Sequence, residues 1–133
     1  MTDLATSIGP VCLTIPPEAS LLRVARLAAS ALASLANCSI DEIEDIRIAV
    51  SETMIVLIEQ GEGGPVDLEF NAQPNSFTIV GRTSAENFDP DHPDLDLCSV
   101  VLNEVCTELQ ITFQNNLAEI HATVGRSSPD LNG

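Results

Sequence analysis

Residues 39–52 read SIDEIEDIRIAVSE, and the chain continues from there into the apolar run TMIVLI at residues 53–58. Ser39 is a good helix N-cap, and Glu42 three residues later completes a capping box. The acidic residues that follow suit the positive end of a helix dipole. The stretch therefore predicts a helix that runs to about Glu59 or Gln60 and ends in GEGGP at residues 61–65. Glu52 is the one acidic residue inside the apolar part.

The segments on either side of this helix are typical of an α+β fold. Short β-rich runs form two hairpins and a first strand, and Ala- and Leu-rich or periodic apolar runs form two further helices. The expected strands are 11–15, 66–70, 77–81, 111–113 and 117–124, and the expected helices are 18–36 and 95–108. Residues 82–94 are polar and predict a loop. Asn115 and Asn116 suit the positive φ of a hairpin turn.

This order of elements predicts two layers, with about three helices on one face of a mixed, mostly antiparallel sheet. At 133 residues the chain is long enough to bury one core. We expect an N-terminal segment at 1–9, a single domain at 10–125 and a disordered tail at 126–133.

The net charge of −15, with five Arg and no Lys, argues against direct contact with nucleic acid or an anionic membrane. A basic protein partner fits this charge, and so does a general role in solubility. The sequence shows no signal peptide and no membrane span, so we expect a cytoplasmic protein.

No metal site is expected from the sequence. The four Cys residues are scattered without close pairs, which is typical of buried small hydrophobes. The acidic loop at 89–96 lacks the glycine and the twelfth-position carboxylate of a calcium loop.

Three pieces of the chain resemble the anti-sigma factor serine kinases, a group in the histidine-kinase-like ATPase superfamily with the Bergerat fold. They are LTIP at 13–16, Arg23-Val24, and DIRIAVSE at 45–52, which is similar to the family phrase DI-x-x-AVSE. The resemblance implies that Glu52 occupies the place of the general base for a serine hydroxyl. It also implies that Arg23 and Arg26 lie on a face that grips protein partners, although two ordinary surface arginines remain the alternative.

The positions that hold nucleotide in that family differ here. Val56 stands where the resemblance places the magnesium-binding Asn, and Gln60 stands where it places a His. Gly81 takes the place of the Asp that reads adenine. The family's glycines are replaced at Thr83, Ala85, Asp94 and Asp96.

These differences argue against a nucleotide site of the family type. An isopropyl group cannot bind Mg²⁺, which needs oxygen ligands. A carboxylate about 4 Å from a phosphate costs on the order of 4 kcal/mol at an effective dielectric near 20. Micromolar binding amounts to only about 8 kcal/mol. We therefore expect no cofactor, and we expect Met54, Val56, Leu95 and Leu97 to fill the space.

The sequence leaves three functions open. The preferred one is a non-catalytic, partner-switching regulator that binds a sigma factor, a STAS-type anti-anti-sigma protein or both, as a homodimer. The second is an active serine kinase that uses ATP, Mg²⁺ and Glu52 as base. The third is an unrelated α+β interaction domain. Glu52 itself has a simpler interpretation, as a solvent-facing residue on the same helix face as Asp45 and Glu59.

Overall fold

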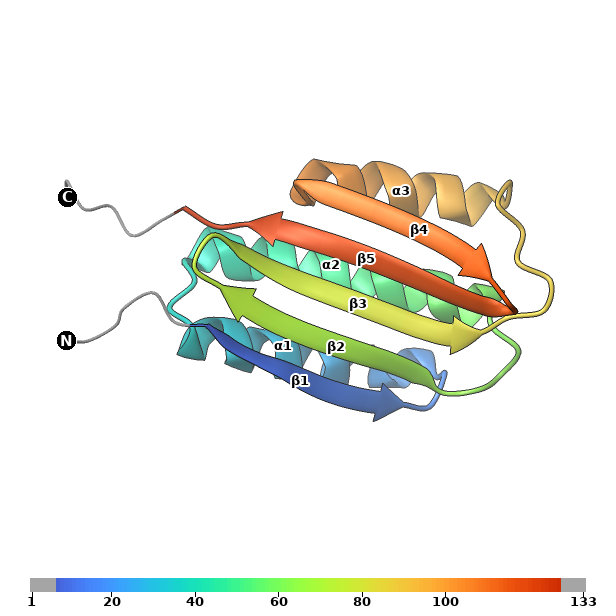
Figure 1. Ribbon diagram of the computed structural model, residues 1–133, viewed down its shortest axis with the longest axis horizontal. Helices are drawn as coiled ribbons and strands as arrows, with labels where there is room; N and C mark the ends of the chain where they lie inside the picture. The colour runs from blue at the N-terminus through green and yellow to red at the C-terminus, as the bar shows by residue number, and fades with distance from the viewer. Residues whose placement is uncertain (1–6, 128–133) are drawn as a thin grey trace.

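The computed structural model describes residues 7–127, which form a five-stranded sheet with three α-helices on one face (Figure 1). The elements are β1 (Ile8–Ile15), a 3₁₀ turn (Ala19–Leu21), α1 (Leu22–Leu35), α2 (Ile40–Gln60), β2 (Val66–Gln73), β3 (Ser76–Ser84), α3 (Pro93–Val105), β4 (Glu108–Gln114) and β5 (Leu117–Gly125). The predicted two-layer α+β fold is confirmed.

The strand order across the sheet is β1-β2-β3-β5-β4, and every neighbouring pair is antiparallel. We predicted a mixed, mostly antiparallel sheet, but no parallel strand pair is found among the described residues. β5 lies inside the sheet, between β3 and β4, although it is the last strand in the chain.

The core lies between the helices and the inner face of the sheet. It is aliphatic apart from Phe70 and Phe77, whose ring centroids are 6.2 Å apart. Burial alternates along β2 and β5, so that every second side chain faces the helices. The other face of the sheet is open and polar. On it, the Arg82 guanidinium donates to Glu119 and lies 3.7 Å from a Glu69 oxygen.

The start of α2 has the predicted capping box. The Glu42 N–H donates to Ser39 Oγ at 3.1 Å, and the Ser39 N–H donates to Glu42 Oε1 at 2.8 Å. Because these contacts depend on residues only three apart, the local sequence was enough to locate the helix start.

The segment after β5 closes the corner between α1 and α2. The Arg126 guanidinium donates to the carbonyls of Gln73 (2.5 Å) and Ala36 (2.6 Å). The Ser127 N–H donates to the second carboxylate oxygen of Glu42 at 2.7 Å. These two residues belonged to the tail expected to be disordered, and the rest of that tail lies outside the described residues.

Several predicted element bounds were wrong. β2 continues to Gln73, and α3 ends at Val105, so that Glu108 begins β4. β1 begins at Ile8 and includes Gly9-Pro10, because an edge strand with one neighbour tolerates a proline. β3 continues to Ser84, since its last residues pair with β5. α3 begins at Pro93, with His92 as its cap.

Two further sequence expectations can be compared with the structure. Asn115 and Asn116 adopt positive φ of 53° and 60°, as predicted for the β4–β5 turn. Among residues 7–127, none of the helices combines the length and the apolar character that crossing a bilayer requires.

Candidate functional site

The candidate site lies where α2 and α3 pack side by side behind the sheet (Figure 1). Glu52 falls in the middle of the α2 range Ile40–Gln60. Glu52 is half-buried, so it is not simply a solvent-facing residue. The thiol of Cys98 on α3 faces it. Burial, the hydrogen bond to Glu52 and nearby carboxylates raise the pKa of Cys98 to about 12. The thiol therefore stays protonated at neutral pH.

Three of the four apolar residues that were expected to fill the family's nucleotide position are buried. Val56 is 2% exposed, and Met54 and Leu95 are also buried. Leu97 is 64% exposed, so the expectation that it fills this space was wrong. The buried face of α3 carries Leu95, Cys98 and Leu102 at spacings of three and four. Leu97 therefore falls on the outer side of the helix.

Gly81 is packed directly against α2. A Cβ at this position would lie 2.7 Å from Leu57 Cδ1 and 2.8 Å from Thr53 Cγ2. Side chains of α2 thus already fill the space that any larger residue would need on this face of β3. The position has no room for an aspartate that could read an adenine amino group.

Three of the positions assigned to nucleotide make hydrogen bonds within the protein, namely Gln60, Thr83 and Ala85. Thr83 is buried, and its Oγ1 donates to the Pro65 carbonyl at 3.0 Å. The N–H of the buried Ala85 donates to the Asn116 carbonyl at 2.9 Å. The Gln60 amide donates to the Asp89 carbonyl at 2.9 Å and accepts from the Asp89 N–H at 3.0 Å. These contacts fasten the loop before α3 to the end of α2.

The start of α3 is strongly acidic. Asp94 and Asp96 are exposed in the first turn, where the helix dipole favours carboxylates. Burial raises the pKa of Glu59, and the hydrogen bond to Asp94 and its charge raise it further. The N-terminus of α3 is therefore already supplied with negative charge.

A nucleotide triphosphate with Mg²⁺ does not match these residues. The positions that the resemblance assigns to the metal ligand and the adenine acceptor hold Val56 and Gly81, which have no side-chain oxygen. The assigned phosphate positions hold Asp94 and Asp96, whose charges oppose phosphate.

A groove of about 220 Å³ lies between α1 and α2 on the outer side of the helix layer. It is lined by Arg26, Glu44, Arg47, Ile48, Ser51 and Glu52. Arg26 Nη1 donates to Ser51 Oγ at 3.1 Å, and Arg47 pairs with Glu44 at 3.1 Å. The structure thus brings two predicted residues, Arg26 and Glu52, to one groove. Arg23 is exposed on α1 but does not line the groove.

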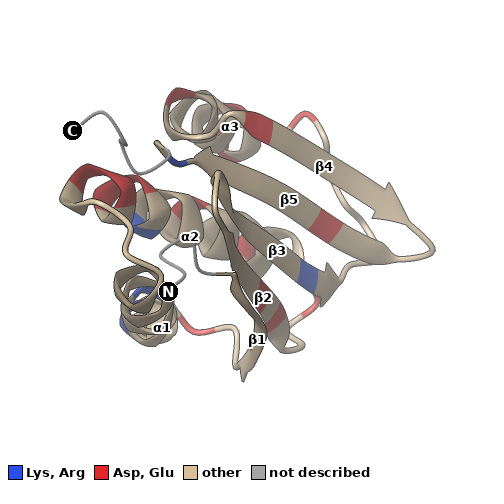
Figure 2. Ribbon diagram, turned by 60° about the vertical axis from the view of Figure 1, so that its left-hand side comes forward, with Lys and Arg blue, Asp and Glu red and all other residues tan. Residues whose placement is uncertain are grey.

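The charge of α1 contrasts with that of the rest of the helix layer. α1 carries Arg23 and Arg26 and no acidic residue, while the first half of α2 and the loop before α3 are rich in acids (Figure 2). Three of the five Arg residues lie on α1 and α2, and the groove between these helices is lined by two of them together with Glu44 and Glu52.

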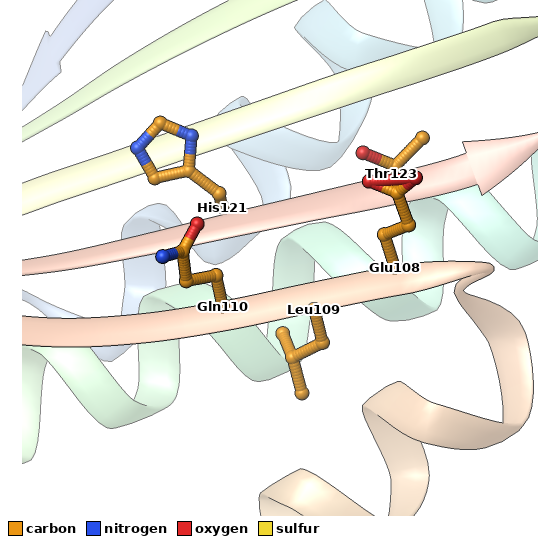
Figure 3. Close-up of a pocket in the computed structure, with 5 residues that line it drawn as sticks. All are labelled: Glu108, Leu109, Gln110, His121 and Thr123. Atoms are coloured by element: carbon orange, nitrogen blue, oxygen red, sulfur yellow. The ribbon is translucent and has the colours of Figure 1, made fainter.

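A second hollow, of about 450 Å³, lies along β4 and β5 near His121 (Figure 3). Glu108, Gln110, His121 and Thr123 line it together, because Glu108 pairs with Thr123 and Gln110 with His121 in the sheet register. Leu109 points the other way (Figure 3). This hollow is on the open face of the sheet, across from the helices, and no motif in the sequence indicated it.

Comparison with known proteins places these observations in context. A family model described as the histidine kinase-like ATPase domain matches residues 15–113. Among similar curated proteins is a "Serine-protein kinase RsbW" from Halalkalibacterium halodurans, 31% identical over 81 residues, which are 59% of this chain and 50% of the relative.

Proteins of the same name from two other species give similar matches. The one from Bacillus velezensis is 28% identical over 98 residues, covering 71% of this chain and 61% of the relative. The one from Bacillus subtilis is 28% identical over 87 residues, covering 62% and 54%. The chain thus matches between half and about three fifths of the length of these relatives.

Proposed function

Because this chain belongs to the histidine kinase-like ATPase domain family, we propose that it is an anti-sigma-type regulator that acts by binding protein partners. In this proposal the family's nucleotide site has been lost. The scaffold keeps the α1–α2 face, which presents Arg26 and Glu52 at one groove, and uses it for recognition.

The observation that carries the proposal is the packing of α2 on β3. Thr53 and Leu57 fill the space in front of Gly81, and Val56 is buried without an oxygen to offer a cation. Rebuilding a nucleotide site would require both the sheet and the helix to change. Neither change is a simple side-chain rotation, because the interior is close-packed.

Calorimetric titration with ATP and Mg²⁺ tests the loss of the nucleotide site. We expect no saturable heat. Saturable binding tighter than about 100 μM, which corresponds to more than about 5 kcal/mol, would refute the proposal.

The proposed partners are a sigma factor, a STAS-type anti-anti-sigma protein or both. The relatives are named serine-protein kinases, and the family resemblance of residues 45–52 supports partners of this class. The Arg26 guanidinium donates one hydrogen bond to Ser51, and its other N–H groups are available to a carboxylate on the partner. Arg23 lies on the same helix and extends the cationic surface.

Purification from the native host, followed by mass identification of bound proteins, would name the partner. With that partner, Arg26→Ala should weaken binding by about tenfold or more, as loss of a central arginine contact does. Gln110→Ala on the opposite face of the sheet should leave the affinity unchanged. An equal effect of the two changes would exclude the α1–α2 face as the binding surface.

The alternative is an active serine kinase with Glu52 as general base. Its support is that Glu52 is half-buried yet lines an open groove, where a substrate hydroxyl could approach. Transfer of labelled phosphate from ATP to the partner, abolished by Glu52→Gln, would establish it. Failure of transfer to every protein that binds the chain would remove it.

We also propose a homodimer in the cytoplasm, without direct contact to nucleic acid. The net charge of −15 opposes binding to a phosphate backbone. Light scattering on the purified protein measures the oligomeric state, and a monomer at about 100 μM would contradict the dimer.

A further inference from the structure

Three metal-ligating side chains meet where α2 ends and α3 begins. Glu59 comes from the last turn of α2, His92 from the N-cap of α3 and Asp94 from its first turn. One ligand atom from each lies within 4.8 Å of the other two. We propose that these three residues, the α2–α3 metal cluster, bind one divalent transition-metal ion of the Zn²⁺ type. This site is independent of the proposed partner binding, and it replaces our expectation of no metal.

The electrostatic setting favours a cation. Glu59 and Asp94 bring two carboxylate oxygens within 4.8 Å of each other, and the last turn of α2 contains no basic residue. The C-terminal end of a 21-residue helix adds the negative end of its dipole at the same place. Within residues 7–127, the ion pairs of the structure include neither Glu59 nor Asp94. A divalent ion between the carboxylates would offset all of this negative charge.

The ligands are held by regular structure and by a fastened loop. Glu59 and Asp94 belong to helices, and the two-way hydrogen bonds between Gln60 and Asp89 hold the loop that delivers His92. The Asp91 N–H donates to Asp89 Oδ1 at 2.9 Å, which shapes the same loop. Little rearrangement is then needed to collect the three ligands around an ion.

The donor set selects the kind of ion. One imidazole nitrogen and two carboxylate oxygens suit Zn²⁺, Mn²⁺ and similar ions, whereas Mg²⁺ prefers oxygen alone and keeps most of its waters. Three protein ligands also leave coordination positions for water. The exposed position of Glu59 and Asp94 gives the ion a direct route in.

Metal binding competes with the cap of α3. His92 Nδ1 accepts the Asp94 N–H at 3.1 Å, so in the neutral ring the proton sits on Nε2. Coordination through Nε2 needs the proton on Nδ1, and coordination through Nδ1 uses the accepting lone pair. In both cases the Asp94 N–H loses its partner. Binding of the ion therefore changes the hydrogen bonding of the first turn of α3, where this helix packs beside α2.

Calorimetric titration of the chelator-treated full chain with ZnCl₂ tests the proposal. We expect one ion per chain. Glu59→Gln and His92→Asn should each weaken binding by about tenfold or more, as loss of a ligand does. Asn is itself a strong N-cap, so His92→Asn removes the ligand and keeps the helix start. The matched control Asp91→Asn removes an exposed carboxylate of the same loop and should stay within about twofold.

Two further measurements separate this site from other sources of binding. Cys12 is an exposed thiol, and Cys12→Ser should leave the Zn²⁺ affinity unchanged. Addition of Mn²⁺ should broaden the amide NMR signals of residues 59, 92 and 94 before others. The proposal is overturned if binding is absent below about 100 μM, if Cys12→Ser removes it, or if Asp91→Asn weakens it as much as Glu59→Gln does.

Discussion

Gly81→Ala is the substitution that most directly probes the closed contact between α2 and β3. The new Cβ would stand 2.7 Å from Leu57 Cδ1 and 2.8 Å from Thr53 Cγ2, whereas carbon atoms in contact prefer about 3.5–4.0 Å. Each neighbour must therefore retreat by about 1 Å. Both are fully buried, and the β-branched Thr53 has little rotamer freedom in a helix.

The expected cost follows from these distances. Overpacking a filled core costs about 1–3 kcal/mol. Replacing Gly by Ala in a strand recovers about 0.5–1 kcal/mol, because the unfolded chain loses freedom. The net effect should be a loss of about 1–2 kcal/mol in the free energy of unfolding.

Urea denaturation followed by circular dichroism measures this difference, and Gly64→Ala serves as the control. A Cβ at Gly64 would have no atom within 4 Å, so that variant should lie within about 0.5 kcal/mol of the parent. If Gly81→Ala is as stable as the parent, the space in front of β3 is open. The main argument against a nucleotide there would then fail.

Three further outcomes are expected. Thr53 Oγ1 is buried and has no hydrogen-bond partner within residues 7–127. Thr53→Val should therefore raise the free energy of unfolding, measured by urea denaturation, by about 1 kcal/mol. A loss of stability would show that the hydroxyl has a hydrogen-bond partner. Cys98 is buried and its pKa is raised to about 12, so it should react far more slowly with Ellman's reagent at pH 8 than the exposed Cys12. Equal rates would contradict the burial of Cys98 against α2. Burial alone raises the pKa of Glu119, but hydrogen bonds, chiefly from Arg82, outweigh it and hold this pKa below 4.5. A depressed pKa in the folded state contributes stability at neutral pH that is lost as the pH falls through it, so Glu119→Gln should cost up to about 1 kcal/mol at pH 7 and less at pH 3; a constant cost would disprove the linkage.

Local signals explain the part of the fold that the sequence predicts. Ser39 and Glu42 locate the start of α2 because the capping contacts span three residues. Asn115 and Asn116 locate the β4–β5 turn because their side chains tolerate positive φ. The helix and strand periodicities then fix which residues face the core.

Other features depend on partners that are distant in the sequence. Residues 82–84 look like a polar loop, but pairing with β5 makes them strand. The contact between Glu52 and Cys98 arises only when α3 packs on α2. Glu59 lies at the end of α2 and His92 at the cap of α3, 33 positions later, so the sequence of the loop at 89–96 gives no sign that Glu59 lies beside it. The exposure of Leu97 required the orientation of α3, which its apolar spacing left ambiguous.

The position of β5 within the sheet has a consequence for biosynthesis. During translation β3 and β4 emerge before β5. Until β5 has been made, β3 lacks its partner on one side and β4, whose neighbour in the sheet is β5, is unpaired. A nascent chain at that stage exposes unpaired backbone N–H and C=O groups on β3 and β4, together with apolar side chains that later form the core. We expect it to depend on chaperones until the last strand inserts, and early termination before Leu117 should yield aggregates and no smaller folded domain.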